Sequence, residues 1–201
     1  MSRRQAKPAT SPHADSGNRL DIIIDAAAHS FAKAGYDATT MRDIAALTGI
    51  LPGSIYYHFK SKEDLFLAVH DAAIERVCRG VLRAIKPGTE PWTRLEQAAT
   101  GYLDSMLGAD AVYATLIVTE FPKRRSRKLR SALVSHRDRF ERLFTGIIDE
   151  LPLRESVDRR YWRLALMGML AWTHVWYRAG TDSPQAIACK LVEQLRFQTA
   201  Q

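Results

Sequence analysis

The amino-acid sequence predicts an all-α protein of about nine helices. Apolar residues recur at spacings of three and four along most of the chain, which places them on one face of a helix. No segment sustains the alternation of apolar and polar residues that a half-buried strand requires. Capping residues, glycines and prolines divide the chain into segments of helix length, and we find no internal repeat.

The chain begins with a polar segment and a first amphipathic helix. Residues 1–18 contain Pro, Ser and charged residues without apolar periodicity, and we assign them to a disordered tail. The first helix carries Ile23, Ala27 and Phe31 on one face. It is expected to stop at Gly35, because glycine readily adopts the left-handed backbone conformation that ends a helix.

Two short helices are expected next. Thr40 and Asp43 have the spacing of a capping box, in which each side chain binds an unpaired backbone N–H, so a helix should cover residues 41–47. Gly49 ends it. Pro52 fits the first position of the following helix, where its missing N–H costs nothing.

Six further helices are expected after residue 60. Capping residues, prolines and glycines again set their limits. The expected ranges are residues 61–83, 92–107, 110–121, 123–151, 158–178 and 183–197.

Composition argues against several classes of protein. A chain of 201 residues, 46% apolar and 25% charged, has globular composition with room for one sizeable core or two small ones. Its two cysteines give neither a disulfide framework nor metal-ligand spacing, so we expect a reducing compartment, the cytoplasm. The longest apolar stretch, LALMGMLAW at 164–172, is about half a membrane span, so no membrane partner is expected. No motif of an enzyme stands out, and no cofactor or metal is predicted.

The net charge of +7 is unevenly distributed. Residues 1–66 carry eight basic and seven acidic residues, whereas residues 123–142 carry nine basic and two acidic ones. The excess of positive charge therefore lies in one later helix and not in the N-terminal segment.

Residues 40–59 have the spacing of a helix-turn-helix. Two helices that meet at a steep angle need a small residue at their contact, a glycine in the turn and an apolar residue that locks the second helix. Ala45, Gly49 and Ile55 supply these in order. The second helix of such a unit usually enters the major groove of DNA, which makes its outer face a candidate DNA-binding face.

The segment GSIYYHFKSK at 53–62 has two distinct faces when it is drawn as a helix. Ile55 and Phe59 lie one turn apart and are expected to face the core. The opposite side presents Gly53, Ser54, Tyr57 and His58, with Tyr56 at its flank. Hydroxyl groups, an imidazole and an almost bare backbone suit close approach to phosphates and base edges.

The stretch ATTMRDIAALTGILPGSIYYHFKSKEDLF at 38–66 resembles the DNA-binding domain of the TetR family of transcriptional regulators. Helix number, helix order and chain length are similar to the family over essentially the whole sequence. The resemblance implies a DNA-binding domain at 19–66 and a ligand-binding and dimerisation domain at 67–201. In the family the last two helices form a four-helix dimer interface.

The resemblance also implies DNA contacts at nine positions. Thr40 and Arg42 match residues that touch phosphate and base. The base-facing start of the recognition helix is matched by Pro52, Gly53 and Ser54. Thymine-methyl and phosphate contacts are matched by Tyr56, Tyr57 and His58, and a phosphate-binding lysine is matched by Lys62. Leu51 departs from the family, whose members often carry a capping Ser or Thr at this position. Base reading would then rely more on Ser54 and Arg42. The tail at 1–18 is either a solvated end or an arm for the minor groove.

The later helices contain large side chains that suit either a packed core or a ligand cavity. Core packing is the default for any one of them. The family architecture motivates a pocket, for which the candidates are Trp92, Tyr102, Met106, Tyr113, Ile117, Arg130, Arg137, Phe140, Met167 and Trp172.

The basic helix adds a chemical clue. Arg130 and Arg137 fall beside the apolar stripe that contains Leu133 and Phe140, where a guanidinium suits a carboxylate or phosphate. Two interpretations follow: the stems cross apolar surface and the heads meet water, or the two arginines hold the charged head of an anionic amphiphile. The segment WYRAGTDSPQAIA at 176–188 is similar to TetR-type regulators of fatty-acid or steroid breakdown, many of which respond to acyl-CoA thioesters. An acyl-CoA is therefore one expected effector.

The last two helices predict association. YWRLALMGMLAWTHVWY at 161–177 is too apolar to face solvent, and the final helix carries Ile187, Leu191, Val192 and Leu195. A symmetric homodimer would bury both helices and present two recognition helices to a pseudo-palindromic operator in double-stranded DNA. The sequence thus predicts a dimeric, ligand-responsive repressor. The rival interpretations are a helical enzyme and a helical adaptor without sequence-specific DNA binding.

Overall fold

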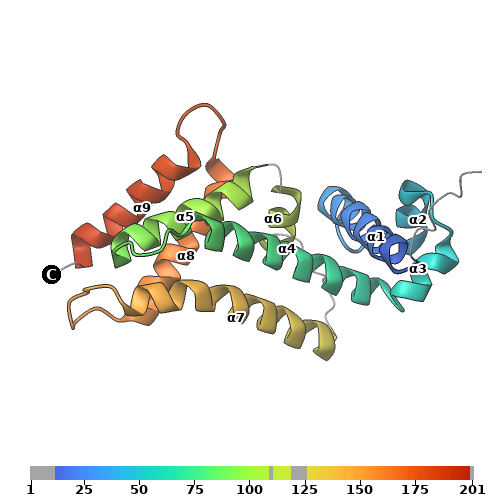
Figure 1. The fold of residues 1–201 in the computed structure, drawn as a ribbon, viewed down its shortest axis with the longest axis horizontal. Helices are drawn as coiled ribbons and strands as arrows, with labels where there is room; N and C mark the ends of the chain where they lie inside the picture. Colours follow the sequence, from blue (N-terminus) through green and yellow to red (C-terminus); the bar gives the residue numbers. More distant parts are fainter. Residues whose placement is uncertain (1–11, 109–110, 119–125, 200–201) are drawn as a thin grey trace, which may run out of the picture.

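The computed structural model describes residues 12–108, 111–118 and 126–199, and the all-α prediction is confirmed for them (Figure 1). The described residues form nine helices. These are α1 Pro12–Ala34, α2 Met41–Thr48, α3 Pro52–His58, α4 Lys62–Ala84, α5 Pro91–Leu107, α6 Ala111–Val118, α7 Arg127–Asp149, α8 Arg159–Trp176 and α9 Pro184–Thr199.

The starts of α1 and α7 differ from the sequence prediction by more than two residues. Helix α1 begins at Pro12, so residues 12–18, which the sequence assigns to a disordered tail, are helical. Residues 1–11 lie outside the described part, as do residues 119–121 of the helix expected at 110–121. Residues 123–125 of the basic segment also lie outside it, and α7 begins at Arg127, capped by the hydroxyl of Ser126.

Local capping chemistry sets the limits of the first helices as expected. Thr40 and Asp43 form a reciprocal capping box at α2, and Gly49 ends that helix in left-handed backbone with φ of 66°. The hydroxyl of Ser61 accepts a hydrogen bond from the backbone N–H of Asp64 and caps α4. Each of these contacts joins residues that are close together in the chain, which explains why the pattern of residues predicts them.

The helices bury two apolar cores that α4 connects. Figure 1 shows α1, α2 and α3 gathered at one end of the molecule, with α4 running from them between α5 and α7. The first core joins α1–α3 and the first half of α4 to residues of α6 and α7, and the second joins the rest of α4 to α5, α7, α8 and α9. The domain limit expected after residue 66 falls inside α4. A helix shared by both cores can carry a displacement from one to the other.

Helices α4 and α5 approach closely at two glycines. A Cβ atom added at Gly101 would lie 2.5 Å from the carbonyl oxygen of Gly80 and 2.9 Å from the Cα of Val81. Any side chain at Gly101 would therefore force the two helix backbones apart. Glycine here sets the position of α4, and with it the position of the first three helices.

Candidate DNA-binding face and effector cavity

Helices α2 and α3 pair as the sequence predicts for a helix-turn-helix. Ala45 and Ile55 are buried between them, and Phe59 is buried at the end of α3. The first core holds all three side chains. The inner face of α3 is thereby fixed, and its other face is left to the surface.

The outer face of α2 and α3 presents most of the predicted DNA contacts. Arg42, Pro52, Gly53, Ser54, Tyr56 and Tyr57 are exposed, and His58 is half-buried with its ring edge-on to that of Tyr57 at 5.3 Å. Thr40 is exposed as well, but its hydroxyl donates to the Asp43 carboxylate at 2.7 Å as part of the cap. Within the described part of the chain Arg42 makes no ion pair, so its guanidinium is available to a phosphate or a base.

Lys62 is placed differently from the phosphate-binding role implied for it. Its ammonium donates to the backbone carbonyls of Tyr36 and Thr39, at 2.8 Å each, and lies 4.4 Å from the centre of the Tyr36 ring. The side chain therefore ties the start of α4 to the loop between α1 and α2. A contact from this ammonium to DNA phosphate would have to be shared with these carbonyls.

A cavity of about 370 Å³ lies between α4, α6 and α7. Its lining residues are His70, Ile74, Ile117, Arg130, Leu133, Val134, Arg137 and Phe140. Four of them, Ile117, Arg130, Arg137 and Phe140, are among the predicted candidates. Arg130, Val134 and Arg137 are exposed and form the rim, while Ile74 and Leu133 belong to the buried wall.

The other cavity candidates lie elsewhere. Trp92, Tyr102 and Met106 are buried in the second core, where Met167 packs against them, and Tyr113 is buried in the first core. The ring of Tyr102 lies 5.4 Å from that of Phe140, behind the cavity wall. Trp172 is 62% exposed on α8 and does not line this cavity. Helix α8 is apolar on two faces, and the sequence pattern could not show which of them faces inward.

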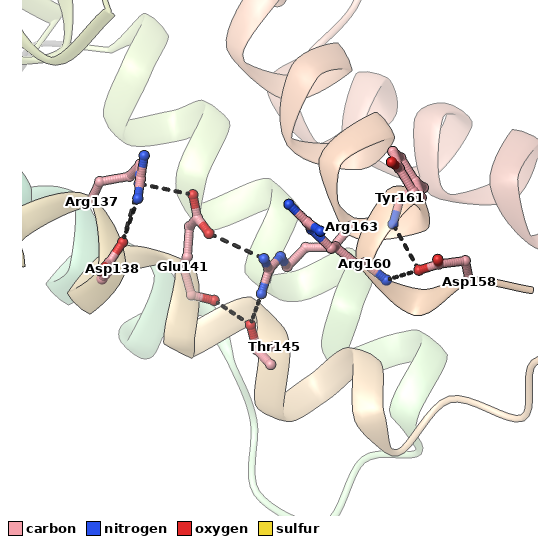
Figure 2. A network of polar contacts seen from close by, with 8 residues as sticks. All are labelled: Arg137, Asp138, Glu141, Thr145, Asp158, Arg160, Tyr161 and Arg163. Atoms are coloured by element: carbon pink, nitrogen blue, oxygen red, sulfur yellow. Dashed lines mark hydrogen bonds and ion pairs between the residues drawn. The ribbon is translucent and has the colours of Figure 1, made fainter. Parts of the chain in front are cut away.

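The two arginines at the cavity rim differ in their partners. Arg137 donates to Asp138 at 2.8 Å and lies 3.4 Å from a carboxylate oxygen of Glu141. Figure 2 shows that Glu141 also faces Arg163 of α8, at 3.3 Å. Arg130 makes no ion pair with any residue that the structure describes. Among the described residues, no carboxylate is paired with Arg130, whereas Arg137 has two.

Two histidines stack beside the cavity, and one of them, His70, lines it. The Nδ1 atoms of His70 on α4 and His136 on α7 lie 3.0 Å apart, and the rings stack at 5.2 Å. Burial lowers the pKa of His70 to about 4, and the neighbouring His136 adds to this effect. Burial also lowers the pKa of His136, against the opposing influence of Asp71. Sequence reasoning could not find this pair, because its members are far apart in the chain and no motif contains them.

Helix α6 connects the cavity to the first core. Tyr113 donates its hydroxyl hydrogen to the Asp25 carboxylate of α1, and Arg76 of α4 donates to the same carboxylate at 3.1 Å. The Arg76 guanidinium lies 3.7 Å from the centre of the Tyr113 ring. Ile117, one helical turn after Tyr113, lines the cavity. One short helix therefore touches both the cavity and the helices of the first core.

A stripe of large apolar side chains is exposed on α8. Tyr161, Leu164, Trp172, Val175 and Trp176 are between 45% and 66% exposed and recur at helical spacing, and Phe197 of α9 is 87% exposed. Such a patch on one chain is typical of a surface that a protein partner covers. Among the described helices none has the length and hydropathy to cross a bilayer, and the described residues contain no cluster of three or more metal-ligating side chains.

Two segments of the chain match models of known protein families. Residues 23–69 match the model described as bacterial regulatory proteins, tetR family, and residues 88–196 match that of the tetracyclin repressor-like C-terminal domain. The HTH-type transcriptional repressor KstR2 of Rhodococcus jostii (strain RHA1) is 28% identical over 177 residues, 86% of each chain.

Two solved structures share the fold. The transcriptional regulator FadR from Bacillus subtilis, in complex with stearoyl-CoA, is 21% identical with a TM-score of 0.74, covering 87% of this chain and 96% of FadR. AibR, in complex with isovaleryl coenzyme A and operator DNA, is 20% identical with a TM-score of 0.75, covering 88% of this chain and 97% of AibR.

Proposed function

Because this chain belongs to the TetR family of bacterial regulatory proteins, we propose that it is a dimeric repressor released from its operator by an anionic amphiphile of the acyl-CoA class. The family membership makes it a transcriptional regulator and not an enzyme. The observation that carries the effector class is the cavity between α4, α6 and α7, whose wall is apolar and whose rim holds Arg130 and Arg137.

The cavity suits the apolar part of such an effector. A volume of about 370 Å³ is at the small end of ligand pockets, so it would take an acyl group while the rest of the molecule stays outside. The charged part would then lie at the rim, where Arg130 forms no ion pair with the described residues. A guanidinium binds phosphate and carboxylate oxygens in a bidentate way, which fits an anionic head. The names of the FadR and AibR complexes, each with a coenzyme A thioester, support the same class.

DNA binding is assigned to the outer face of α2 and α3. The nine predicted contacts remain the candidates, with Arg42 as the exposed cation and Ser54, Tyr57 and His58 as hydrogen-bonding groups. Residues 1–66 carry almost no net charge, so these groups, more than a basic patch, would provide the affinity.

The homodimer is assigned to α8 and α9. The exposed stripe of α8 offers an apolar surface that a second copy can cover with the same residues, because a two-fold axis pairs a patch with itself. Burial of Trp172 and Trp176 would remove two large rings from water. A two-fold dimer also fits a pseudo-palindromic operator.

The response to the effector is assigned to α6 and α4. An acyl group in the cavity would touch Ile117, and the same helix holds Tyr113 against Asp25 of α1. A shift of α6 would then reach the first core, which positions α2 and α3. The effector can change DNA affinity only by the difference between its affinities for the two states.

The test is operator binding by the purified protein with and without acyl-CoA thioesters of graded chain length. The duplex comes from the DNA upstream of the protein's own coding sequence. Release by one thioester should require about tenfold more of it for Arg130→Ala, because a hydrogen bond to a charged group is lost. Arg142→Ala is the matched control, since Arg142 is an exposed arginine on the same helix that is not part of the cavity.

Three results would each contradict a different part of the proposal. Equal thioester requirements for Arg130→Ala and Arg142→Ala would remove the head-group assignment. Operator binding that no thioester changes would remove the effector class and leave a regulator. If the protein shows no salt-dependent binding to a specific duplex, the adaptor interpretation replaces the repressor.

A further inference from the structure

Leu51 is a large apolar side chain on the DNA-binding face that neither packs nor caps. It is 77% exposed, and its side chain makes no capping hydrogen bond to α3. A single exposed leucine is ordinary on a protein surface. Leu51 differs because it stands in the turn of the helix-turn-helix, directly before Pro52, and the large exposed side chains that follow it on α3, Tyr56 and Tyr57, are aromatic.

The backbone holds Leu51 in a fixed position on this face. The N–H of Ser54 donates to the carbonyl oxygen of Leu51 at 2.8 Å, and Pro52 follows with its φ restricted by its ring. Leu51 therefore moves with α3 and not as part of a loose loop. In the proposed DNA complex the turn and the start of the second helix approach the base edges.

The chemistry of the major groove offers one partner for such a side chain. Leucine has no donor or acceptor, so it cannot read the hydrogen-bonding edges of guanine, adenine or cytosine. Among the four bases only thymine presents an apolar group there, its C5-methyl. We propose that Leu51 contacts a thymine C5-methyl and so selects thymine at one position of each operator half-site, an inference that depends on the proposed DNA binding.

The expected size of this preference follows from the buried methyl group. Removing one methyl-sized group from water contributes about 0.8 kcal/mol, which corresponds to about a fourfold change in affinity. Replacing the contacted thymine by deoxyuracil removes the methyl and leaves every hydrogen-bonding group of the base unchanged. The wild-type protein should therefore bind the substituted duplex about fourfold more weakly, at one position per half-site.

The experiment uses the full-length protein and a duplex selected by it from a random pool. Each thymine of that duplex is replaced singly by deoxyuracil, and affinities are measured for wild type, Leu51→Ala and Leu82→Ala. Leu51→Ala should bind both forms equally at the thymine that Leu51 contacts, and it should keep any preference at thymines that Tyr56 or Tyr57 contacts. Leu82 is 55% exposed on α4 and away from α3, so Leu82→Ala is the matched control and should keep the wild-type preference.

A second variant separates base reading from a role in folding. Leu51→Ser places a hydroxyl at the position that precedes α3, where serine is a favourable cap and leucine is not. We expect Leu51→Ser to unfold at a higher temperature than wild type while it loses the thymine preference. A structural role for Leu51 would lower the unfolding temperature instead.

The inference is overturned if wild type binds thymine and deoxyuracil duplexes equally at every position, or if Leu51→Ala keeps every thymine preference that wild type shows. Both results can occur with a protein that still binds a specific DNA sequence, so they do not contradict the proposed function as a regulator. Failure to select any sequence from the pool removes the proposed DNA binding and this inference together.

Discussion

Acidification should destabilise the fold through His70. Its side chain is 3% exposed, and burial lowers its pKa from 6.5 to about 4. Between these two values the unfolded chain binds a proton that the folded chain does not, so the free energy of unfolding falls as the pH is lowered through this window. For this one group the loss between about pH 7 and about pH 5 is about 2 kcal/mol. The pKa of His136 is also lowered, which acts in the same direction.

Urea unfolding at several values between about pH 7 and about pH 5 measures this loss. His70→Gln keeps a polar group beside His136 but does not titrate, so most of the pH dependence should disappear. His29→Gln replaces an exposed histidine of α1 and should keep the wild-type slope. The capping carboxylates of Asp43, Asp64 and Glu90 have lowered pKa values and are protonated only below this window. Equal slopes for wild type and His70→Gln would refute the reasoning.

Three further predictions concern the framework around the sites. Gly101→Ala should lower the free energy of unfolding, measured by chemical denaturation, by about 1–3 kcal/mol, because the new Cβ meets the backbone of α4. Gly146→Ala, in an open position of α7, should raise the same free energy by about 0.5–1 kcal/mol. Lys62→Met should lower the same free energy by about 1.5–3 kcal/mol, since carbonyls of the α1–α2 loop lose a charged donor; an unchanged urea midpoint would contradict this. Trp172→Glu should shift sedimentation toward the monomer and weaken operator binding, and a stable dimer with this variant would exclude α8 from the interface.

Features set by near neighbours in the chain could be predicted from the sequence. The capping box joins Thr40 to Asp43, three residues later, and the left-handed Gly49 follows Thr40 by nine residues. The buried face of α3 follows from the same local pattern, because Ile55 and Phe59 are its strongly apolar residues. The family resemblance added the order of the helices, which no single spacing provides.

Features set by distant parts of the chain could not be predicted. Lys62 looks like a surface lysine in the sequence, and only the folded loop brings the carbonyls of Tyr36 and Thr39 to its ammonium. The partners of Arg137 were missed for a different reason. Asp138 and Glu141 stand within four residues of Arg137 and pair with its guanidinium. These carboxylates compete with a ligand for Arg137 only because the fold places Arg137 at the cavity rim.

The position of α6 decides how an effector could act on DNA binding. The cavity wall includes His70 and Ile74 of α4, but those side chains lie in a long helix that both cores hold along its length. Helix α6 is only one residue longer than α3 and presents Ile117 to the cavity and Tyr113 to Asp25. A short helix with one side on the cavity can move as a unit at less cost than a helix anchored in two cores. A ligand that fills the cavity without displacing Ile117 would bind equally well to both states, and it would then leave the operator complex intact.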